Sequence, residues 1–172
     1  FWGKVPVLRA SSLYYFEKNS SIQTILHELK YRGNKEIGEV LGREMGRELF
    51  AVSSSIDVIV PVPLHPNRLK KRGYNQSFFL AKGIAQEIKK PIDTNNLIRK
   101  TENLTQTNKN LYERWINVEN IFQLKDFSTF EGKHILLVDD VLTTGATVEA
   151  CIRTILATKN VKISVATLAF VA

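Results

Sequence analysis

The sequence predicts an α/β fold in which a mainly parallel β-sheet is flanked by helices. Strand-like and helix-like segments alternate along the chain, as they do in proteins built from strand–helix–strand units. The segment 57–63 is predicted as a continuous apolar strand, a pattern typical of parallel strands that are buried on both faces, and the longest clean apolar run of the chain is Ile135 to Val138. The chain has 172 residues, of which 44% are hydrophobic and 24% are charged, which suits one domain over residues 1–172 with its own core.

The first third of the chain predicts one strand and two helices. Residues 12–16 form a short β-prone run, and apolar residues at helical spacing predict helices over 20–33 and 35–52. The second helix carries three glycines, one every fourth residue and all on one stripe: Gly38, Gly42 and Gly46. Glycine weakens a helix, so we expect this stripe to let another element pack closely.

The rest of the chain continues the alternation. A strand at 57–63 precedes a polar, basic loop over 64–76, and an amphipathic helix over 77–90 stops at Pro91. A short strand at 96–100 leads into a long polar segment with little pattern. The remaining elements are then expected as strand 134–139, helix 145–158 and strand 161–169.

The net charge of +7 is concentrated in the middle of the chain. Residues 1–60 carry a net charge of +1, residues 61–120 carry +6, and residues 121–172 carry none. This distribution predicts either a solvated basic surface or a polyanionic partner, which is a nucleic acid or a phosphorylated small molecule.

Cysteine content and hydropathy exclude other classes of protein. Cys151 is the one cysteine, so the chain contains no disulfide framework and no cysteine-rich zinc site, and we expect this residue to lie in the core. A reducing compartment fits this composition, and we expect a cytoplasmic protein. No apolar run approaches the length of a membrane span, so we expect no membrane insertion.

Two adjacent carboxylates and a threonine-rich turn predict a ligand site. Asp139 and Asp140 follow an apolar strand at the carboxyl edge of the expected sheet, where open α/β proteins bind ligands. Carboxylates there accept hydrogen bonds from vicinal hydroxyls or bind a hydrated Mg²⁺. The turn 143–147 opens a helix, whose free N–H groups and dipole hold a phosphate. The predicted ligand is a sugar phosphate.

Three alternatives fit this segment less well. Plain helix capping does not require two acids followed by three threonines. A response-regulator receiver needs more than the 32 residues that follow Asp140. A Walker A loop is excluded because the chain has no G-x-x-x-x-G-K-[ST] motif.

The segment "ILLVDDVLTTGAT" (135–147) resembles the signature of type I phosphoribosyltransferases, which bind 5-phosphoribosyl-1-pyrophosphate (PRPP). The resemblance implies that Asp139 and Asp140 contact the ribose hydroxyls, with Mg²⁺ held near them through PRPP and water and no direct protein metal site. It further implies that the 5′-phosphate is held by the turn, which consists of Thr143, Thr144, Gly145, Ala146 and Thr147.

Three further segments resemble ComF-like (competence protein F, or GntX-like) proteins of the same fold. They are "LHELKYRGNKEIGEVLG", "VIVPVPLHPNRLKKRGYNQSFFLAKGIA" and "LIRKTENLTQTNKNLYERWINVENIF". The resemblance covers roughly residues 12–170. It implies a type I phosphoribosyltransferase fold with a small N-terminal hood over residues 1–50 and a PRPP-binding core over 56–172.

The same resemblance implies two groups of residues for the pyrophosphate and for catalysis. The loop after strand 57–62 is expected to bind pyrophosphate through Leu64, His65, Lys70, Lys71 and Arg72. The segment 99–118 is expected to be a mobile catalytic loop, with Arg99, Lys100, Gln106 and Arg114 as candidates. Asn75 is interpreted either as a helix cap or as a ligand, and Tyr74 as core or as a stacking residue.

Two departures from the family pattern narrow these expectations. Purine phosphoribosyltransferases place an Asp, which serves as general base, where this chain has Thr143, so a guanine or hypoxanthine acceptor is not expected. The four-cysteine zinc segment that usually precedes the matched region has no counterpart in the chain, so no zinc site is implied. We also expect His27 to be on the surface or in packing, and His134 to be exposed.

The sequence leaves competing functions open. The first is a phosphoribosyltransferase that transfers the phosphoribosyl group to an unidentified acceptor with release of pyrophosphate. The second is a PRPP-regulated or non-catalytic protein that handles single-stranded DNA in natural competence. A PRPP-sensing transcription regulator would need a helix-turn-helix module, and the first 50 residues show no convincing one. The acceptor and the oligomeric state are not determined by the sequence.

Overall fold

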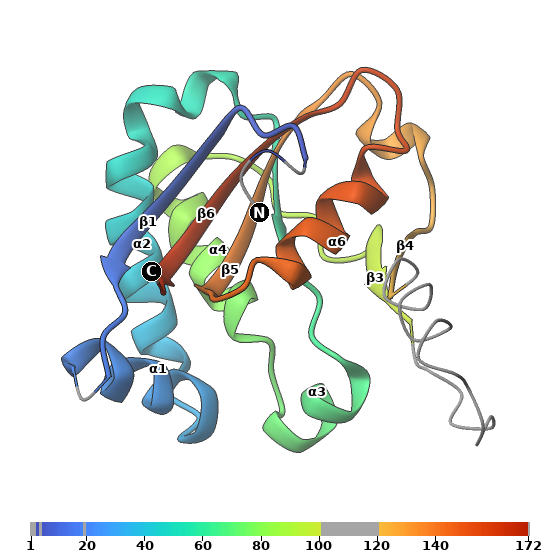
Figure 1. The fold of residues 1–172 in the computed structure, drawn as a ribbon. Coiled ribbons are helices and arrows are strands. Elements are labelled where there is room, and N and C mark those ends of the chain that lie inside the picture. The colour runs from blue at the N-terminus through green and yellow to red at the C-terminus, as the bar shows by residue number, and fades with distance from the viewer. Residues whose placement is uncertain (1–2, 4, 19, 101–120, 172) are drawn as a thin grey trace, which may run out of the picture.

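A four-stranded parallel sheet organises the computed structural model, which describes residues 3, 5–18, 20–100 and 121–171. The strand order is β1-β6-β5-β2, and all three neighbouring pairs run parallel (Figure 1). The four strands are β1 (Arg9–Tyr15), β2 (Val58–Pro61), β5 (His134–Leu142) and β6 (Lys162–Phe170). The predicted α/β fold with a parallel sheet is confirmed.

Helices cover both faces of this sheet because its central strands are apolar on both faces. One face packs against α1 (Ser21–Tyr31), α2 (Lys35–Leu49) and α4 (Gln76–Ile88). The other face packs against α6 (Ala146–Ile155) and a small antiparallel pair, β3 (Leu97–Arg99) and β4 (Phe122–Leu124). Two short 3₁₀ turns, Phe50–Ser55 and Ser128–Phe130, complete the connections.

Alternation along β5 explains how one strand serves two cores. Leu136 and Val138 pack with the helices of the first face, whereas Ile135 and Leu137 pack with α6 and the antiparallel pair. All four side chains are fully buried, as the continuous apolar run predicts. The strand thereby presents its next two residues, both aspartates, at the carboxyl end of the sheet.

The glycine stripe of α2 is a packing device, as predicted. A Cβ atom built on Gly42 would lie 2.2 Å from the carbonyl oxygen of Leu80 in α4. In the reverse direction, a Cβ atom on Gly83 would lie 2.2 Å from the carbonyl oxygen of Glu39. The two helices therefore approach backbone to backbone, and no other residue fits at either position without moving a helix.

The basic segment 64–76 is not a plain loop, because it contains the seven-residue helix α3 (Pro66–Arg72). Pro66 occupies the first helical turn, where its fixed φ is favourable, and the preceding His65 caps the helix. Gly73 ends the helix with a φ of 82°, in the left-handed region that glycine adopts easily. The N-terminal signal, Pro66, and the C-terminal signal, Gly73, are both present in the sequence. The segment is nevertheless predicted as a loop because it is polar and basic.

Two other expectations change. β5 runs to Leu142, three residues beyond the expected end at 139, so Asp140 lies within the strand together with Asp139. His134 is 9% exposed instead of exposed, since its Nδ1 lies 2.9 Å from the carbonyl oxygen of Ser55 and its Nε2 lies 2.9 Å from Ser164 Oγ. Within residues 1–50, β1 joins the sheet, and α1 and α2 pack in the core on one of its faces; the hood over these residues stays a prediction.

Among the helices that the structure describes, none combines the length and the hydrophobicity that a membrane span requires.

Candidate functional site

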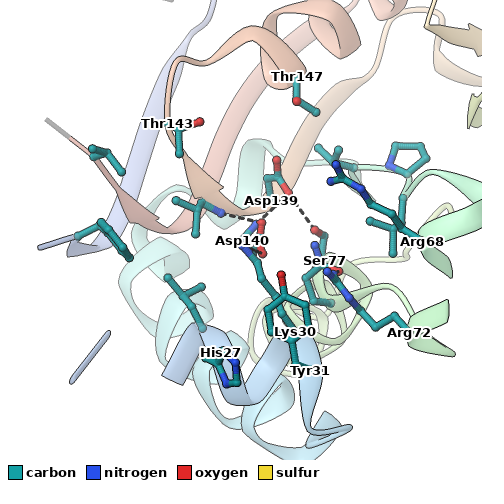
Figure 2. A pocket seen from close by; sticks show the side chains of 18 of the residues that line it. His27, Lys30, Tyr31, Arg68, Arg72, Ser77, Asp139, Asp140, Thr143 and Thr147 are labelled. Atoms are coloured by element: carbon teal, nitrogen blue, oxygen red, sulfur yellow. Dashed lines mark hydrogen bonds and ion pairs between the residues drawn. The ribbon is translucent and has the colours of Figure 1, made fainter. Parts of the chain in front are cut away.

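A cavity of about 450 Å³ opens at the carboxyl edge of the sheet, between α1 and α3. Figure 1 shows these two helices beyond the ends of the strands. Residues from α1, the β2–α3 connection, α3, the start of α4 and the end of β5 line the cavity. This is the place that an open parallel sheet offers to a ligand. Figure 2 shows the two aspartates at its centre.

Asp139 is held rigidly beneath the cavity. Its side chain is 7% exposed, and its Oδ1 accepts hydrogen bonds from Ser77 Oγ at 3.0 Å and from the Asp140 N–H at 2.9 Å. Burial, followed by the neighbouring charge of Asp140, raises the pKa of Asp139 to about 8. This carboxyl group therefore holds its proton more tightly than an ordinary aspartic acid does.

Asp140 is compensated by a cation from α1. Its Oδ1 accepts a hydrogen bond from the Val141 N–H at 2.9 Å, and its Oδ2 lies 2.9 Å from Lys30 Nζ. The contact with Lys30 is an ion pair without hydrogen-bond geometry, because the buried Oδ2 receives no hydrogen bond from the residues that the structure describes. Asp140 is 6% exposed and is paired with Lys30. Its Oδ2 can still accept a hydrogen bond from a ligand.

The threonine-rich turn forms another wall. Thr143 and Thr147 line the cavity, and Figure 2 shows both on the same side of the aspartates. Gly145 starts α6 with a φ of 78°, and Thr144 Oγ1 accepts a hydrogen bond from the Ala146 N–H at 3.4 Å. The first turn of a helix leaves N–H groups without intrahelical partners. The turn thus offers backbone donors and two hydroxyl groups beside the carboxylates.

The opposite wall is basic. Arg68 and Arg72 of α3 line the cavity, whereas Lys70 does not, and Lys71 lines an adjoining cavity. Arg72 donates a hydrogen bond to the buried Gln76 and lies over the ring of Tyr31, 5.6 Å from its centroid. Arg68 and Arg72 are four residues apart and therefore lie on the same face of α3, which explains why both line the cavity and Lys70 does not.

The neighbours of α3 have structural roles. His65 Nδ1 accepts a hydrogen bond from the Asn67 N–H at 3.1 Å and so caps the helix, while Leu64 lines the cavity. Asn75 caps α4, accepting from the Ser77 N–H at 3.1 Å and donating to the Val62 carbonyl at 2.9 Å. Tyr74 is buried, and its hydroxyl donates to the Leu29 carbonyl. Asn75 is therefore a helix cap in this structure, and Tyr74 is a core residue.

The residues expected for catalysis are divided. Arg99 lines the cavity from β3, and its guanidinium lies 5.4 Å from the ring centroid of Phe122. Lys100 is exposed and does not line the cavity. Gln106 and Arg114 lie outside the described residues.

Sequence reasoning missed three side chains of this site. Ser77 and Lys30 each contact one aspartate, and Arg68 faces the cavity from α3. The position of Arg68 can be predicted once α3 is recognised, because Arg68 then lies one helical turn before Arg72 and on the same face. Ser77 and Lys30 are 62 and 110 residues from their partners, so no local pattern points to them.

The donor set suits a metal that is shared with a ligand better than a metal held by protein alone. No group of three or more His, Cys, Asp or Glu side chains comes together within the described ranges. The cavity offers carboxylate oxygens from two residues. Mg²⁺ commonly binds through one or two carboxylates and completes its shell with phosphate oxygens and water. The residues present therefore fit Mg²⁺ as part of a phosphate complex.

Comparison with known proteins identifies the family of the chain. Residues 74–172 match the family model described as the phosphoribosyl transferase domain. The chain is 33% identical over 132 residues to the DNA utilization protein YhgH of Salmonella typhi, covering 74% of this chain and 57% of the relative. It is 34% identical over 139 residues to the competence protein ComFC of Bacillus subtilis, covering 80% of this chain and 55% of the relative.

The chain spans a little over half the length of these curated relatives. Among solved structures, an allosteric regulatory enzyme of purine biosynthesis superposes with a TM-score of 0.49 at 19% identity, over 81% of this chain and 29% of that one. A likeness this low adds nothing about function.

Proposed function

The chain belongs to the phosphoribosyl transferase domain family, in its ComF-like group, and from this premise we propose that the cavity binds PRPP for transfer of its phosphoribosyl group. The acceptor of the group is unidentified, and pyrophosphate is the other product. The observation that carries the proposal is that hydrogen-bond acceptors lie opposite cationic donors across one cavity. Two buried carboxylates and a helix-opening turn face two guanidinium groups (Figure 2).

The acidic wall suits the ribose 5-phosphate half of PRPP. Asp139 and Asp140 offer acceptors for vicinal hydroxyls, and the turn that ends in Thr147 offers donors for a phosphate. Ser77 holds Asp139 in place, so the acceptor geometry exists before the ligand binds. A cavity of about 450 Å³ lies within the usual range for small-molecule sites.

The basic wall suits the pyrophosphate half. Transfer breaks the bond between C1 and a pyrophosphate oxygen, and the electron pair leaves on pyrophosphate. Arg68 and Arg72 supply positive charge where that negative charge develops, and a guanidinium binds phosphate oxygens in a bidentate manner. Mg²⁺, when bound with PRPP, supplies further charge neutralisation at the phosphates. Leu64 and His65 remain proposed contributors from the same segment, whereas Lys70 and Lys71 do not line this cavity.

Calorimetric titration with the two halves of the ligand tests the proposal. Ribose 5-phosphate and pyrophosphate are titrated separately, and PRPP is titrated with and without Mg²⁺. We expect weak saturable binding of each half and tighter binding of PRPP, strengthened by Mg²⁺. Glu131→Gln serves as a control because Glu131 is an exposed carboxylate outside the cavity. A folded protein that binds none of the three compounds would sink the proposal.

A second candidate function is the handling of single-stranded DNA, with PRPP as a regulator. The names of the relatives refer to DNA utilization and competence. Within the part of the chain that the structure describes, the four cations of α3 form no ion pair with an acidic side chain, which leaves their charge for a polyanion.

The two functions separate by salt dependence and by product. The DNA candidate predicts binding of a thymidine oligonucleotide that weakens steeply with salt and falls when Lys70 or Lys71 is removed. The enzyme candidate predicts release of pyrophosphate from PRPP in the presence of an acceptor. Binding of the oligonucleotide that is insensitive to salt would exclude the DNA candidate.

A further inference from the structure

The two edges of the main sheet differ in their protection against pairing with another strand. β2, at one edge, has four residues and ends at Pro61. Its outer side is covered, because the Ile59 N–H donates to the Pro91 carbonyl and the Ile59 carbonyl accepts from the Asp93 N–H, both at 2.9 Å. β1, at the other edge, has seven residues with no proline and no lysine, and it pairs with β6 without a bulge. Proline, lysine, bulges and covering segments are the usual protection of an edge strand, and β1 lacks them.

The backbone of β1 offers hydrogen-bonding groups on its outer side. Alternate residues of a strand direct their N–H and C=O groups to opposite sides. Leu8 and Phe16 each donate an N–H to a carbonyl of β6 at 2.8 Å, so the even-numbered residues between them face β6 as well. The outward-facing residues are the odd-numbered ones: Arg9, Ser11, Leu13 and Tyr15. No main-chain hydrogen bond from another strand or loop of the described chain reaches them.

One face of the sheet is also open beside this edge. A groove of about 290 Å³ lies along β1 and β6, and no charged side chain lines it. Figure 1 shows α6 on the β5 side of this face and no helix in front of β1. Tyr14 and Tyr15 line the groove and are 40% and 58% exposed. An open edge beside an apolar groove suits an added strand, whose backbone extends the sheet while its side chains enter the groove.

The two ends of this edge carry opposite charges. Arg9 begins β1, and Glu17 lies two residues beyond its end at Tyr15. Both side chains are exposed, and neither forms an ion pair within the described parts of the chain. An edge with a cation at one end and an anion at the other is complementary to itself when a second copy runs antiparallel.

We propose that β1 is a dimerisation edge, at which two copies of this chain pair β1 with β1 in antiparallel orientation and join their sheets. A two-fold axis at Leu13 sets Arg9 of each copy opposite Glu17 of the other and Ser11 opposite Tyr15. All of these are outward-facing positions, so they meet as hydrogen-bonded pairs. A register shifted by two residues keeps the hydrogen bonds but separates the charges, so the charges select the register.

The same register brings a side chain to the groove. Tyr14 of the second copy comes opposite Ser12, and both of these residues line the groove. Ser12 and Ala10 are small, so the ring of the second copy's Tyr14 can lie over them at the distance of a cross-strand neighbour. The inference does not depend on the proposed function, because no residue of Arg9–Tyr15 lines the cavity at the carboxyl edge.

Sedimentation velocity of the whole chain, over a series from about 1 to 500 µM, measures the association. We expect a reversible shift from 19.6 kDa to twice that mass. Arg9→Glu and Glu17→Arg each set like charges opposite one another on both sides of the axis, so each should weaken association about tenfold. Lys18→Glu is the matched control, because it changes the net charge as Arg9→Glu does but lies opposite the uncharged Leu8. Its association should match the wild type.

Mixing the two charge variants gives a sharper test than either variant alone. In a mixed dimer of Arg9→Glu with Glu17→Arg, the two substituted positions meet as opposite charges, and so do the two unchanged ones. The mixture should therefore associate as the wild type does, and so should the double variant that carries both changes. Variants that remain monomeric when they are mixed would overturn the inference.

Amide hydrogen exchange, followed by NMR, locates the interface. The N–H groups of Ser11 and Leu13 should become protected as the dimer forms, whereas that of Ser12, which faces β6, should be protected at every concentration. Ser11→Pro removes one outward donor, which an edge strand tolerates, and should weaken association without lowering the melting temperature.

Three results of these experiments would overturn the inference. The first is a chain that stays monomeric over the whole series. The second is a dimer that leaves the Ser11 and Leu13 amides unprotected, since it would form through another surface. The third is protection of these amides in the monomer, since another segment of the same chain would then cover the edge.

Discussion

The two walls of the candidate site are built in opposite ways. The acidic wall is part of β5, a central strand with a hydrogen-bonded neighbour on each side, and its two aspartates are 7% and 6% exposed. The basic wall is a seven-residue helix whose four cations include three that are exposed. The acidic wall is held by the sheet register, whereas the basic wall is held by the helix caps His65 and Gly73.

The difference shows where pre-organisation costs free energy. Burying a carboxylate requires partners, and here these are Ser77, the backbone and Lys30. An exposed guanidinium stays hydrated and costs the fold little. The acidic wall is therefore expected to be rigid and to set the position of the sugar, while the basic wall adjusts to the phosphates. Substitutions in each wall and changes of pH test this contrast, and their effects should differ widely in size.

The double change Asp139→Asn/Asp140→Asn should give the largest effect. It replaces one acceptor oxygen of each side chain by an NH2 donor and removes the charge, and each hydrogen bond to a charged group contributes about 1.5–3 kcal/mol. We expect affinity for ribose 5-phosphate and PRPP to fall about 100-fold or more, as measured by calorimetry. Affinity for pyrophosphate should change less than threefold. An equal loss for pyrophosphate would contradict the division into two walls.

The pH dependence of ribose 5-phosphate binding should be the next largest effect. The pKa of Asp139 is raised to about 8, so an ionised carboxylate becomes available only as the pH rises. Affinity should increase from pH 6.5 to about 8, approaching tenfold per pH unit, and then level off. The dependence should flatten in Asp139→Asn. Proton release on binding, measured in buffers of different ionisation enthalpy, gives an independent check.

The same raised pKa predicts how stability changes with pH. The folded protein holds this proton more tightly than the unfolded chain, in which the pKa of Asp is near its ordinary value of 3.8. The contribution of Asp139 to the free energy of unfolding is therefore full below that value and is lost as the pH rises to about 8. Relative to the wild type, Asp139→Asn should be more stable at pH 8 than at pH 5 in thermal denaturation.

Arg68→Gln should weaken pyrophosphate binding about tenfold, which corresponds to one charge-assisted hydrogen bond. Lys70→Gln is the matched control on the same helix, because Lys70 does not line the cavity. Ribose 5-phosphate affinity should stay unchanged in both variants. If Lys70→Gln weakens pyrophosphate binding as strongly as Arg68→Gln does, the basic wall acts through its overall charge and not through the position of Arg68.

His65→Ala should have the smallest effect. The change removes the cap of α3, which typically contributes about 1 kcal/mol to local helix stability. Pyrophosphate affinity should fall about twofold to fivefold because the helix frays. Ribose 5-phosphate affinity and the global unfolding transition should hardly change. A large drop in melting temperature would show that α3 supports the fold, against the proposed contrast.

The elements with a strong periodic pattern were predicted well. The alternation of strands and helices and the buried character of β2 and β5 follow from hydrophobic spacing, which acts within a few residues. The glycine stripe of α2 predicted a close neighbour but could not identify α4 as that neighbour. α3 was missed because basic residues masked its cap signals, and His134 was misjudged because its partners lie 30 and 79 residues away.

Local order along the chain was enough to establish the parallel sheet, the pair of aspartates and the turn that follows them. It did not establish that Lys30 pairs with Asp140, that Ser77 holds Asp139, or that Arg68 lines the cavity while Lys70 does not; these follow from the three-dimensional structure. The physical reason is that long-range partners are set by how helices pack on the sheet. That packing depends on the fit of the whole core and not on any local pattern.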